Sequence, residues 1–364
     1  MFFRKVEDFT PANVTAALRP LYPDVQVSNV SIVSQHQGSA SHLLLALRYT
    51  QPQPSLPQHI FVKTLLDAGR DALPSGFAET LAGDLALAMY ATETKAYALI
   101  NAELALEAPK LFASALGEKP GEFYLFLENL NDRDAICPKV IPALAVDRVA
   151  NLLQTLAALH AAYWQSPRLD SDLAWFETST EGRLTRFLKS GGWEPIDTEF
   201  QIAYKAAILR DIGIDRAQMQ TAFWRRQESL NAMPQTFLHG DAHPGNIYFL
   251  PDGAVGLLDW QLARRGPWTH DVSYAIISAL EVSDRRAHER ELLAHYKSQL
   301  QKLGVDNLPG NDDMWLAHRQ SPAWGLPMWG STPAVMYSQA EVETVVRRFG
   351  EAWLDFDTGA ALGL

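Results

Sequence analysis

The sequence predicts an α+β protein of two lobes: a small lobe that contains strands and one helical segment, and a larger, mostly helical lobe. Strand-like runs separated by proline-rich turns are concentrated in the first third of the chain, and helical apolar spacing dominates the rest. The length of 364 residues allows two lobes that each have a core. We therefore predict a first lobe of residues 1–128 and a second of residues 129–364, connected near 128–132.

The first lobe shows three strand signals and one helix signal. Residues 42–50 and 59–66 are apolar strand-like runs, and the prolines between them prevent either strand from continuing. Residues 83–106 have the composition and spacing of a helix, and residues 122–130 form a third strand-like run. These elements predict a small sheet accompanied by a long helix.

The second lobe begins with an amphipathic helix over 147–164, whose apolar residues recur on one face. We expect His160, on the apolar side of this helix, to be packed and hydrogen-bonded. Two short strands follow at 247–250 and 255–260, separated by the turn 251–253, and helical spacing resumes at 271–280. Asp271 stands where a helix N-cap is expected.

The overall composition excludes several classes of protein. A formal net charge of −11 argues against a surface for duplex nucleic acid, which needs clustered lysine and arginine. No apolar run reaches the roughly 20 residues that span a bilayer, and acidic residues near the N-terminus argue against a signal peptide. The single cysteine, Cys137, excludes an internal disulfide. We expect a cytoplasmic protein with no nucleic-acid or membrane partner, and the sequence does not indicate its oligomeric state.

The segment FLHGDAHPGNIYFLPDGAVGLLDWQ holds the densest group of polar residues that could carry chemistry. Asp241 and Asn246 lie in a loop tightened by proline and glycine, and Asp259 ends the next apolar strand. One carboxylate is available to accept a hydroxyl proton, while an amide oxygen and a second carboxylate are hard ligands of the kind that Mg²⁺ prefers. Phosphoryl transfer needs an oriented nucleophile and a metal that neutralises phosphate charge.

The spacing of His239, Asp241, Asn246 and Asp259 repeats the protein-kinase pattern H-x-D-x-x-x-x-N followed by a metal-binding aspartate. It resembles the H-G-D-x-H-x-x-N signature of the aminoglycoside phosphotransferase and choline kinase superfamily. The stretches LAALHAAYW, EAPKLFAS, YLFLENL and LLDWQ resemble the ecdysteroid-kinase-like branch of that group. This resemblance implies a bilobal protein-kinase-like fold, in which the small lobe has an antiparallel sheet and one key helix and the larger lobe is mostly helical. It also implies that Asp241 is the catalytic base, that Asn246 and Asp259 are Mg²⁺ ligands, and that His239 is a scaffold residue.

The same resemblance implies an ATP site in the first lobe. Lys63 would hold the phosphates and Glu93 would be its helix partner, with Glu79 and Glu103 as rivals for that role. Solvent-exposed positions for the lysine and for Glu93 are the alternative.

Two further segments of the first lobe would complete the ATP site. Glu128 and Leu130 would lie in the segment whose backbone binds adenine. Gly38, Ser39 and Ser41 would lie in the loop that covers the phosphates, although the chain has no G-x-G. Their backbone N–H groups and hydroxyls still suit phosphate.

We therefore expect an ATP- and Mg²⁺-dependent kinase that phosphorylates a hydroxyl of a small molecule, such as an amino alcohol, a sugar, a sterol-like alcohol or an antibiotic. One alternative is a metal-dependent hydrolase that uses His239, Asp241 and His243, although a histidine pair four residues apart shares a face only on a helix. The other is a catalytically inactive kinase-like binding protein. The tryptophans at 315, 324 and 329 belong either to the core or to the acceptor pocket.

Overall fold

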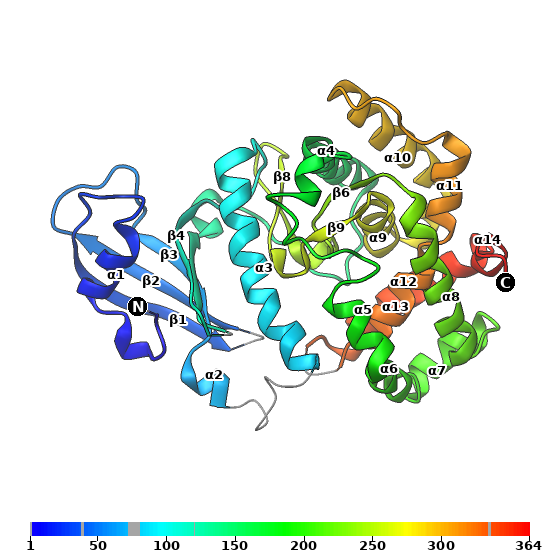
Figure 1. Ribbon diagram of the computed structural model, residues 1–364, viewed down its shortest axis with the longest axis horizontal. Helices are drawn as coiled ribbons and strands as arrows, with labels where there is room; N and C mark the ends of the chain where they lie inside the picture. The colour runs from blue at the N-terminus through cyan, green and yellow to red at the C-terminus, as the bar shows by residue number, and fades with distance from the viewer. Residues whose placement is uncertain (1, 38–39, 72–80, 120, 334–335) are drawn as a thin grey trace. The chain divides into compact units, whose positions relative to one another are not determined.

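The computed structural model describes residues 2–37, 40–71, 81–119, 121–333 and 336–364 (Figure 1). The chain forms two compact units. Unit 1 consists of Met1–Ile136 and Leu258–Gln261, and unit 2 of Cys137–Leu257 and Leu262–Leu364. The first break in the chain thus follows Ile136, a few residues after the boundary expected from the sequence, and the short segment around Asp259 joins unit 1.

Unit 1 contains five strands and three helices among its described residues. These elements are α1 (Pro11–Leu18), β1 (Val27–Gln37), β2 (Ser41–Tyr49), β3 (His59–Thr64), α2 (Asp67–Asp71), α3 (Leu81–Glu103), β4 (Leu111–Leu116) and β5 (Phe123–Glu128). The strands form one antiparallel sheet in the order β1-β2-β3-β5-β4.

The two faces of this sheet bury different residues because side chains alternate along a strand. Ile60 and Val62 of β3 belong to the apolar core that also contains Val14 and Leu18 of α1. Phe61 and Lys63 point to the opposite face, and Figure 1 shows α1 and α3 on opposite sides of the sheet. The register places His42 of β2 opposite Lys63, so the two share that second face.

Unit 2 is mainly helical. Its helices are α4 (Val146–Tyr163), α5 (Arg183–Phe187), α6 (Trp193–Glu199), α7 (Ala203–Asp211), α8 (Arg216–Ser229), α9 (Thr269–Ala279), α10 (Val282–Lys302), α11 (Asn311–Arg319), α12 (Pro322–Gly330), α13 (Gln339–Asp355) and α14 (Thr358–Ala361). Its strands are β6 (Gln235–Leu238), β7 (Ile247–Phe249), β8 (Val255–Leu257) and β9 (Arg264–Pro267). Two antiparallel pairs, β6 with β9 and β7 with β8, frame the loop between β6 and β7.

Local sequence explains where the main helices of unit 2 lie. The apolar face of α4 is fully buried at Val149, Leu152 and Leu156, as the helical spacing predicts. Helix α8 begins at a capping box, in which the Asp215 carboxylate accepts the Gln218 N–H at 2.8 Å. Trp324 and Trp329 belong to the large apolar core of the unit.

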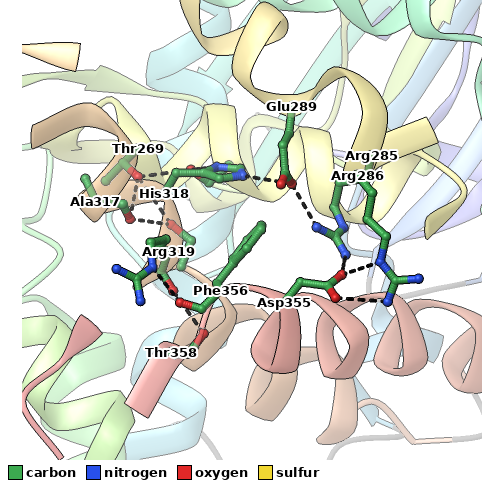
Figure 2. A network of polar contacts seen from close by, with 12 residues as sticks. Thr269, Arg285, Arg286, Glu289, Ala317, His318, Arg319, Asp355, Phe356 and Thr358 are labelled. Atoms are coloured by element: carbon green, nitrogen blue, oxygen red, sulfur yellow. Dashed lines mark hydrogen bonds and ion pairs between the residues drawn. The ribbon is translucent and has the colours of Figure 1, made fainter. Parts of the chain in front are cut away.

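A network of buried charges connects the C-terminal helices (Figure 2). Arg285 of α10 donates to Glu289 at 2.8 Å and pairs with Asp355 at the end of α13. Glu289 lies 3.7 Å from His318 of α11. Arg286, the exposed neighbour of Arg285, also pairs with Asp355, at 2.7 Å. These contacts fix α10, α11 and α13 to one another.

The α+β fold class predicted from the sequence is confirmed, and the strand signals at 42–50, 59–66 and 122–130 correspond to β2, β3 and β5. The helix signals at 83–106, 147–164 and 271–280 correspond to α3, α4 and α9. None of the helices in the described ranges combines the length and apolarity needed to cross a lipid bilayer.

Candidate active site

A buried lysine with two carboxylate partners lies in unit 1. Lys63 Nζ of β3 is 2.7 Å from Glu93 Oε2 of α3 and 3.2 Å from Asp259 Oδ1. Burial alone would lower the pKa of Lys63, but the two carboxylates raise it above its ordinary value. The lysine therefore carries a positive charge in a place from which water is largely excluded.

Asp259 occupies an unusual backbone conformation. Its φ is +63°, in the left-handed region that residues other than glycine seldom adopt. Its side chain is 30% exposed, whereas those of Lys63 and Glu93 are buried. One carboxylate of the group is therefore open to a ligand while the lysine and the other carboxylate are fixed beneath it. Strained, partly open positions of this kind cluster at functional sites.

The three charged groups line a cavity of about 280 Å³ in unit 1. Phe61, Tyr97 and Leu127 supply apolar walls, and the segment 128–131 that follows β5 lines the cavity as well. A mostly apolar pocket with a few convergent charges is typical of a small-molecule site. Glu128 and Leu130, which the sequence analysis selected, both belong to this lining segment.

His42 is a cavity residue that sequence reasoning missed. It lies opposite Lys63 in the sheet, and its ring centroid is 5.5 Å from that of Phe61. Burial and the charge of Lys63 lower the pKa of His42 to about 4, so its imidazole is neutral at physiological pH. Only the register of β2 against β3 brings this histidine to the lysine, and no local sequence signal reveals that register.

The structure describes one of the three residues that were predicted for the phosphate-covering loop. Gly38 and Ser39 lie outside the described residues. Ser41 is fully buried at the start of β2, where its hydroxyl donates to Gln37 Oε1 at 2.6 Å and accepts the Leu66 N–H at 3.2 Å. Its side chain thus holds the ends of β1 and β2, and a phosphate role for these three residues stays a prediction.

In unit 2, the loop between β6 and β7 presents Asp241 within a network of hydrogen bonds. Tyr274 donates its hydroxyl to Asp241 Oδ1 at 3.1 Å, and Asn246 donates Nδ2 to Oδ2 at 3.0 Å. Burial would raise the pKa of Asp241, but His243, His239 and Tyr274 lower it below its ordinary value. The carboxylate is therefore ionised at neutral pH and able to accept a proton.

Asp271 binds the backbone of the loop between β6 and β7. Its carboxylate accepts the backbone N–H of His239 at 2.7 Å and that of Gly240 at 2.9 Å. His160 Nε2 lies 3.2 Å from the same carboxylate, and His160 Nδ1 lies 2.7 Å from the Tyr296 hydroxyl. The expected packed and hydrogen-bonded state of His160 is confirmed.

The helix N-cap expected at Asp271 is wrong. Helix α9 begins at Thr269 with Trp268 at the N-cap position, so Asp271 lies inside the first turn. Its carboxylate instead accepts two successive backbone N–H groups from another segment, those of His239 and Gly240. These hydrogen bonds join segments that are far apart in the sequence, so the local sequence around Asp271 does not reveal them.

Comparison with known proteins decides the family. The sequence pattern described as "phosphotransferase enzyme family" matches residues 82–304, more than half of the chain. The chain belongs to this family.

Two solved structures of kinases are similar in fold to this chain. A choline kinase from Cryptosporidium parvum Iowa II has a TM-score of 0.54 at 11% identity, covering 96% of this chain and 95% of the other. A microcompartment-associated aminopropanol kinase has a TM-score of 0.52 at 15% identity, covering 95% and 98%. A search of curated proteins found no match. These likenesses show the fold, and the narrower resemblance to the ecdysteroid-kinase-like branch stays a prediction.

Asn246 in unit 2 and Asp259 in unit 1, each considered by itself, offer an oxygen donor of the kind that suits magnesium better than zinc. Asn246 uses its amide nitrogen for Asp241, which leaves its amide oxygen as an acceptor, and Asp259 offers a partly exposed carboxylate. Both are hard oxygen ligands. The Nδ1 atoms of His239 and His243 already accept the N–H groups of Asp241 and Gly245.

A search for groups of three or more histidine, cysteine, aspartate or glutamate side chains able to hold a metal ion found none in the described ranges. The histidines that the hydrolase alternative requires instead shape the loop around Asp241, since their ring nitrogens bind its backbone.

Proposed function

We propose that this phosphotransferase transfers the γ-phosphate of ATP to a hydroxyl group of a small molecule. The observation that carries the proposal is the buried, charged Lys63 on the wall of a mostly apolar cavity in unit 1. A fixed cation beside apolar walls suits a ligand that combines a flat base with phosphates. Glu93 holds the amine in place, and the segment 128–131 supplies backbone groups for the base.

Asp241 is the proposed catalytic base. It accepts the proton of the acceptor hydroxyl while the hydroxyl oxygen forms a bond to the γ-phosphorus. The bond from that phosphorus to the oxygen bridging the β- and γ-phosphates breaks, and ADP leaves with the bridging oxygen. Tyr274 and Asn246, which donate to the two carboxylate oxygens, orient Asp241 for this step.

Asn246 and Asp259 are the proposed ligands of Mg²⁺. When bound, the metal neutralises negative charge on the phosphates. The hydrogen bond from Asn246 to Asp241 keeps the amide oxygen directed away from the base. Lys63 restrains the Asp259 carboxylate through one of its oxygens.

Assay of labelled ATP against a panel of alcohols, amino alcohols, sugars, sterols and antibiotics tests the proposal. The members named here include the kinds of compound in the names of the choline and aminopropanol kinases. We expect labelled phosphate to move to at least one alcohol in the presence of Mg²⁺ and not in the presence of a chelator. A protein that binds neither ATP nor GTP would contradict the proposal, and nucleotide binding without transfer to any acceptor would favour an inactive binding protein.

A further inference from the structure

Two buried arginines lie on one tryptophan in unit 2. Arg226 of α8 and Arg264 of β9 are 1% and 6% exposed. Their guanidinium carbons lie 5.9 and 5.5 Å from the ring centroid of Trp324 in α12. Each guanidinium gains a cation–π contact, but such a contact does not neutralise a charge.

Neither arginine has a carboxylate partner in the part of the chain that the structure describes. Arg264 Nε donates to the Leu262 carbonyl at 3.0 Å, Arg226 Nη1 reaches Gln227 Oε1 at 3.4 Å, and Arg226 Nε has no hydrogen-bond partner among these residues. Buried charges in proteins are normally paired, because an unpaired buried ion is costly.

Other buried arginines of unit 2 follow that rule. Arg285 pairs with Glu289 and Asp355, and Arg348 lies 3.2 Å from Glu281. The Arg226–Arg264 pair is therefore unusual within its own unit. Neither arginine forms an ion pair with a carboxylate among the described residues, and this points to a ligand.

The electrostatics of the surrounding groups agree with this geometry. Burial and the neighbouring Arg264 lower the pKa of Arg226 to about 9, so the group is still charged at neutral pH. Burial and both arginines lower the pKa of His270 to about 3. This histidine is therefore neutral at physiological pH and adds no positive charge beside the two arginines.

Arg264 lies next to the residue that precedes the proposed base. A Cβ atom added to Gly240 would lie 3.2 Å from Arg264 Nε, and Gly240 directly precedes Asp241. Burial lowers the pKa of Arg264, and the charges of Asp271 and then Asp241 oppose this lowering. Positive charge is therefore concentrated next to the carboxylate that is proposed to receive the acceptor's proton.

We propose that Arg264, with Arg226 behind it, binds an anionic group of the acceptor, so that the acceptor is an alcohol that also carries a carboxylate or a phosphate. This inference rests on the proposed function, because it assigns the arginines to the substrate of the same reaction. It differs from the cationic acceptors named for the choline and aminopropanol kinases. The arginine charge would attract such an anion and repel an ammonium group.

Matched sets of alcohols test the inference. Each set holds one alcohol skeleton with a carboxylate, a phosphate, a neutral group or an ammonium group, and kcat/KM is measured with ATP and Mg²⁺. We expect the anionic members to exceed the ammonium member by about tenfold or more, since charge-assisted hydrogen bonds are worth at least that factor. The relative rates of the carboxylate and phosphate members identify which anion is used.

Three variants test whether a preference for anionic acceptors is due to Arg264. Arg264→Gln should remove the preference, and Arg264→Lys should keep part of it because the charge remains. Arg265→Gln is the control: Arg265 is the next residue of β9 and pairs with Asp170 instead. An ammonium preference in the wild type, or an anion preference that survives in Arg264→Gln, would overturn the inference.

A direct binding measurement applies even if no member of the panel is phosphorylated. Inorganic phosphate and acetate are titrated into the wild type and into Arg264→Gln by calorimetry, with circular dichroism to verify folding. We expect saturable binding by the wild type that is at least about tenfold weaker in the variant. No saturable binding of either anion would mean that the arginines only pack against Trp324.

The two proposals fail in different ways. If the protein binds ATP and transfers phosphate to alcohols that carry an ammonium group, the inference of an anionic acceptor is wrong and the proposed kinase function is still supported. If the protein binds no nucleotide, the proposed kinase function is wrong. Binding of phosphate at the two arginines could still be measured in that case.

Discussion

At the residue scale, the charge and the position of the Lys63 ammonium group depend on its two carboxylate partners. Glu93 and Asp259 both approach its ammonium group and keep it charged in a buried position. The arrangement fixes the amine from two sides, so that it is positioned before a ligand arrives. Such preorganisation lowers the cost of binding.

Replacing Lys63 with alanine should chiefly weaken productive ATP binding. The change removes a charge-assisted contact to phosphate, and we expect KM for ATP to rise by about tenfold or more. Steady-state kinetics over a range of ATP concentrations measure this, with Lys119→Ala as an exposed control. Unchanged nucleotide kinetics would assign the phosphate contact to another residue.

Asp271 should make stability depend on acid. Burial would raise its pKa, but the hydrogen bond and charge of His160 lower it to about 2. The pKa of Asp271 in the folded protein lies below that of an ordinary aspartate, so the ionised carboxylate stabilises the fold above a pH of about 4. This stabilisation is lost as the pH falls toward about 2. The shift corresponds to about 2 kcal/mol.

Urea denaturation of the wild type and of Asp271→Asn at several pH values tests this expectation. The free-energy difference between the two proteins should be large at pH 7 and should shrink as the pH approaches 2. A difference that is independent of pH would mean that Asp271 is not ionised in the folded protein.

The sequence revealed some residues of the site and not others. Asp241, Asn246 and Asp259 stand out because their spacing repeats the protein-kinase pattern. Their assignment to catalysis and metal binding remains a prediction. His42 and Arg264 stand out in no such pattern, since strand register brings the first to Lys63 and packing brings the second to Gly240.

At the element scale, the loop between β6 and β7 requires glycine at one position. Gly240 has φ of +87°, and a Cβ there would lie 2.0 Å from the Leu262 carbonyl oxygen. Gly253, in the turn between β7 and β8, has the same φ but nothing within 4 Å of an added Cβ. Substitutions at the two glycines therefore distinguish the cost of a positive φ, which both positions share, from the cost of steric crowding, which arises only at Gly240.

Gly253→Ala should cost about 1–2 kcal/mol, the strain of a left-handed residue with a side chain. Gly240→Ala should cost about 1–3 kcal/mol more, because the loop must also move away from Leu262. Chemical denaturation measures both losses, and the phosphotransfer rate should fall only in Gly240→Ala. Equal costs for the two variants would show that the loop moves away from Leu262 at no cost in stability.

Long periodic elements were predictable, and exposed or irregular ones were not. The buried stripe of α4 gives a helical pattern in sequence because one whole face packs. Strand β1 was missed because it lies at the edge of the sheet and most of its side chains are exposed, which leaves little hydrophobic alternation. Strands β6 and β9 are only four residues each, too short to give a period.

At the scale of the whole molecule, the chain forms two units that are not continuous in sequence. The segment Leu258–Gln261 belongs to unit 1 although residues on both sides of it belong to unit 2. Sequence reasoning divides a chain at one point and does not predict such a return. The ion pair between Asp259 and Lys63 explains why this segment joins unit 1.

The charge network in Figure 2 should govern the stability of unit 2 without affecting nucleotide binding. Arg285→Met leaves the buried Glu289 without its partner, and we expect a loss of about 3–5 kcal/mol. Arg286→Met is the control, because Arg286 shares Asp355 but is exposed, and its loss should be at most about 1 kcal/mol.

Urea denaturation and ATP titration of both arginine variants measure these effects. If Arg285→Met is no less stable than Arg286→Met, the network is not a source of stability. A loss of ATP affinity in folded Arg285→Met would show that the two units depend on each other.

The most direct test of the proposed chemistry compares phosphate transfer from labelled ATP by the wild type and by Asp241→Asn, with ATP affinity measured on the same preparations. Asparagine keeps the size of the side chain and one oxygen for Tyr274, but it cannot take the acceptor's proton. We predict that ATP affinity is retained while the transfer rate falls by about 10²–10⁴-fold. Transfer by Asp241→Asn at close to the wild-type rate would contradict the role of Asp241 as the base.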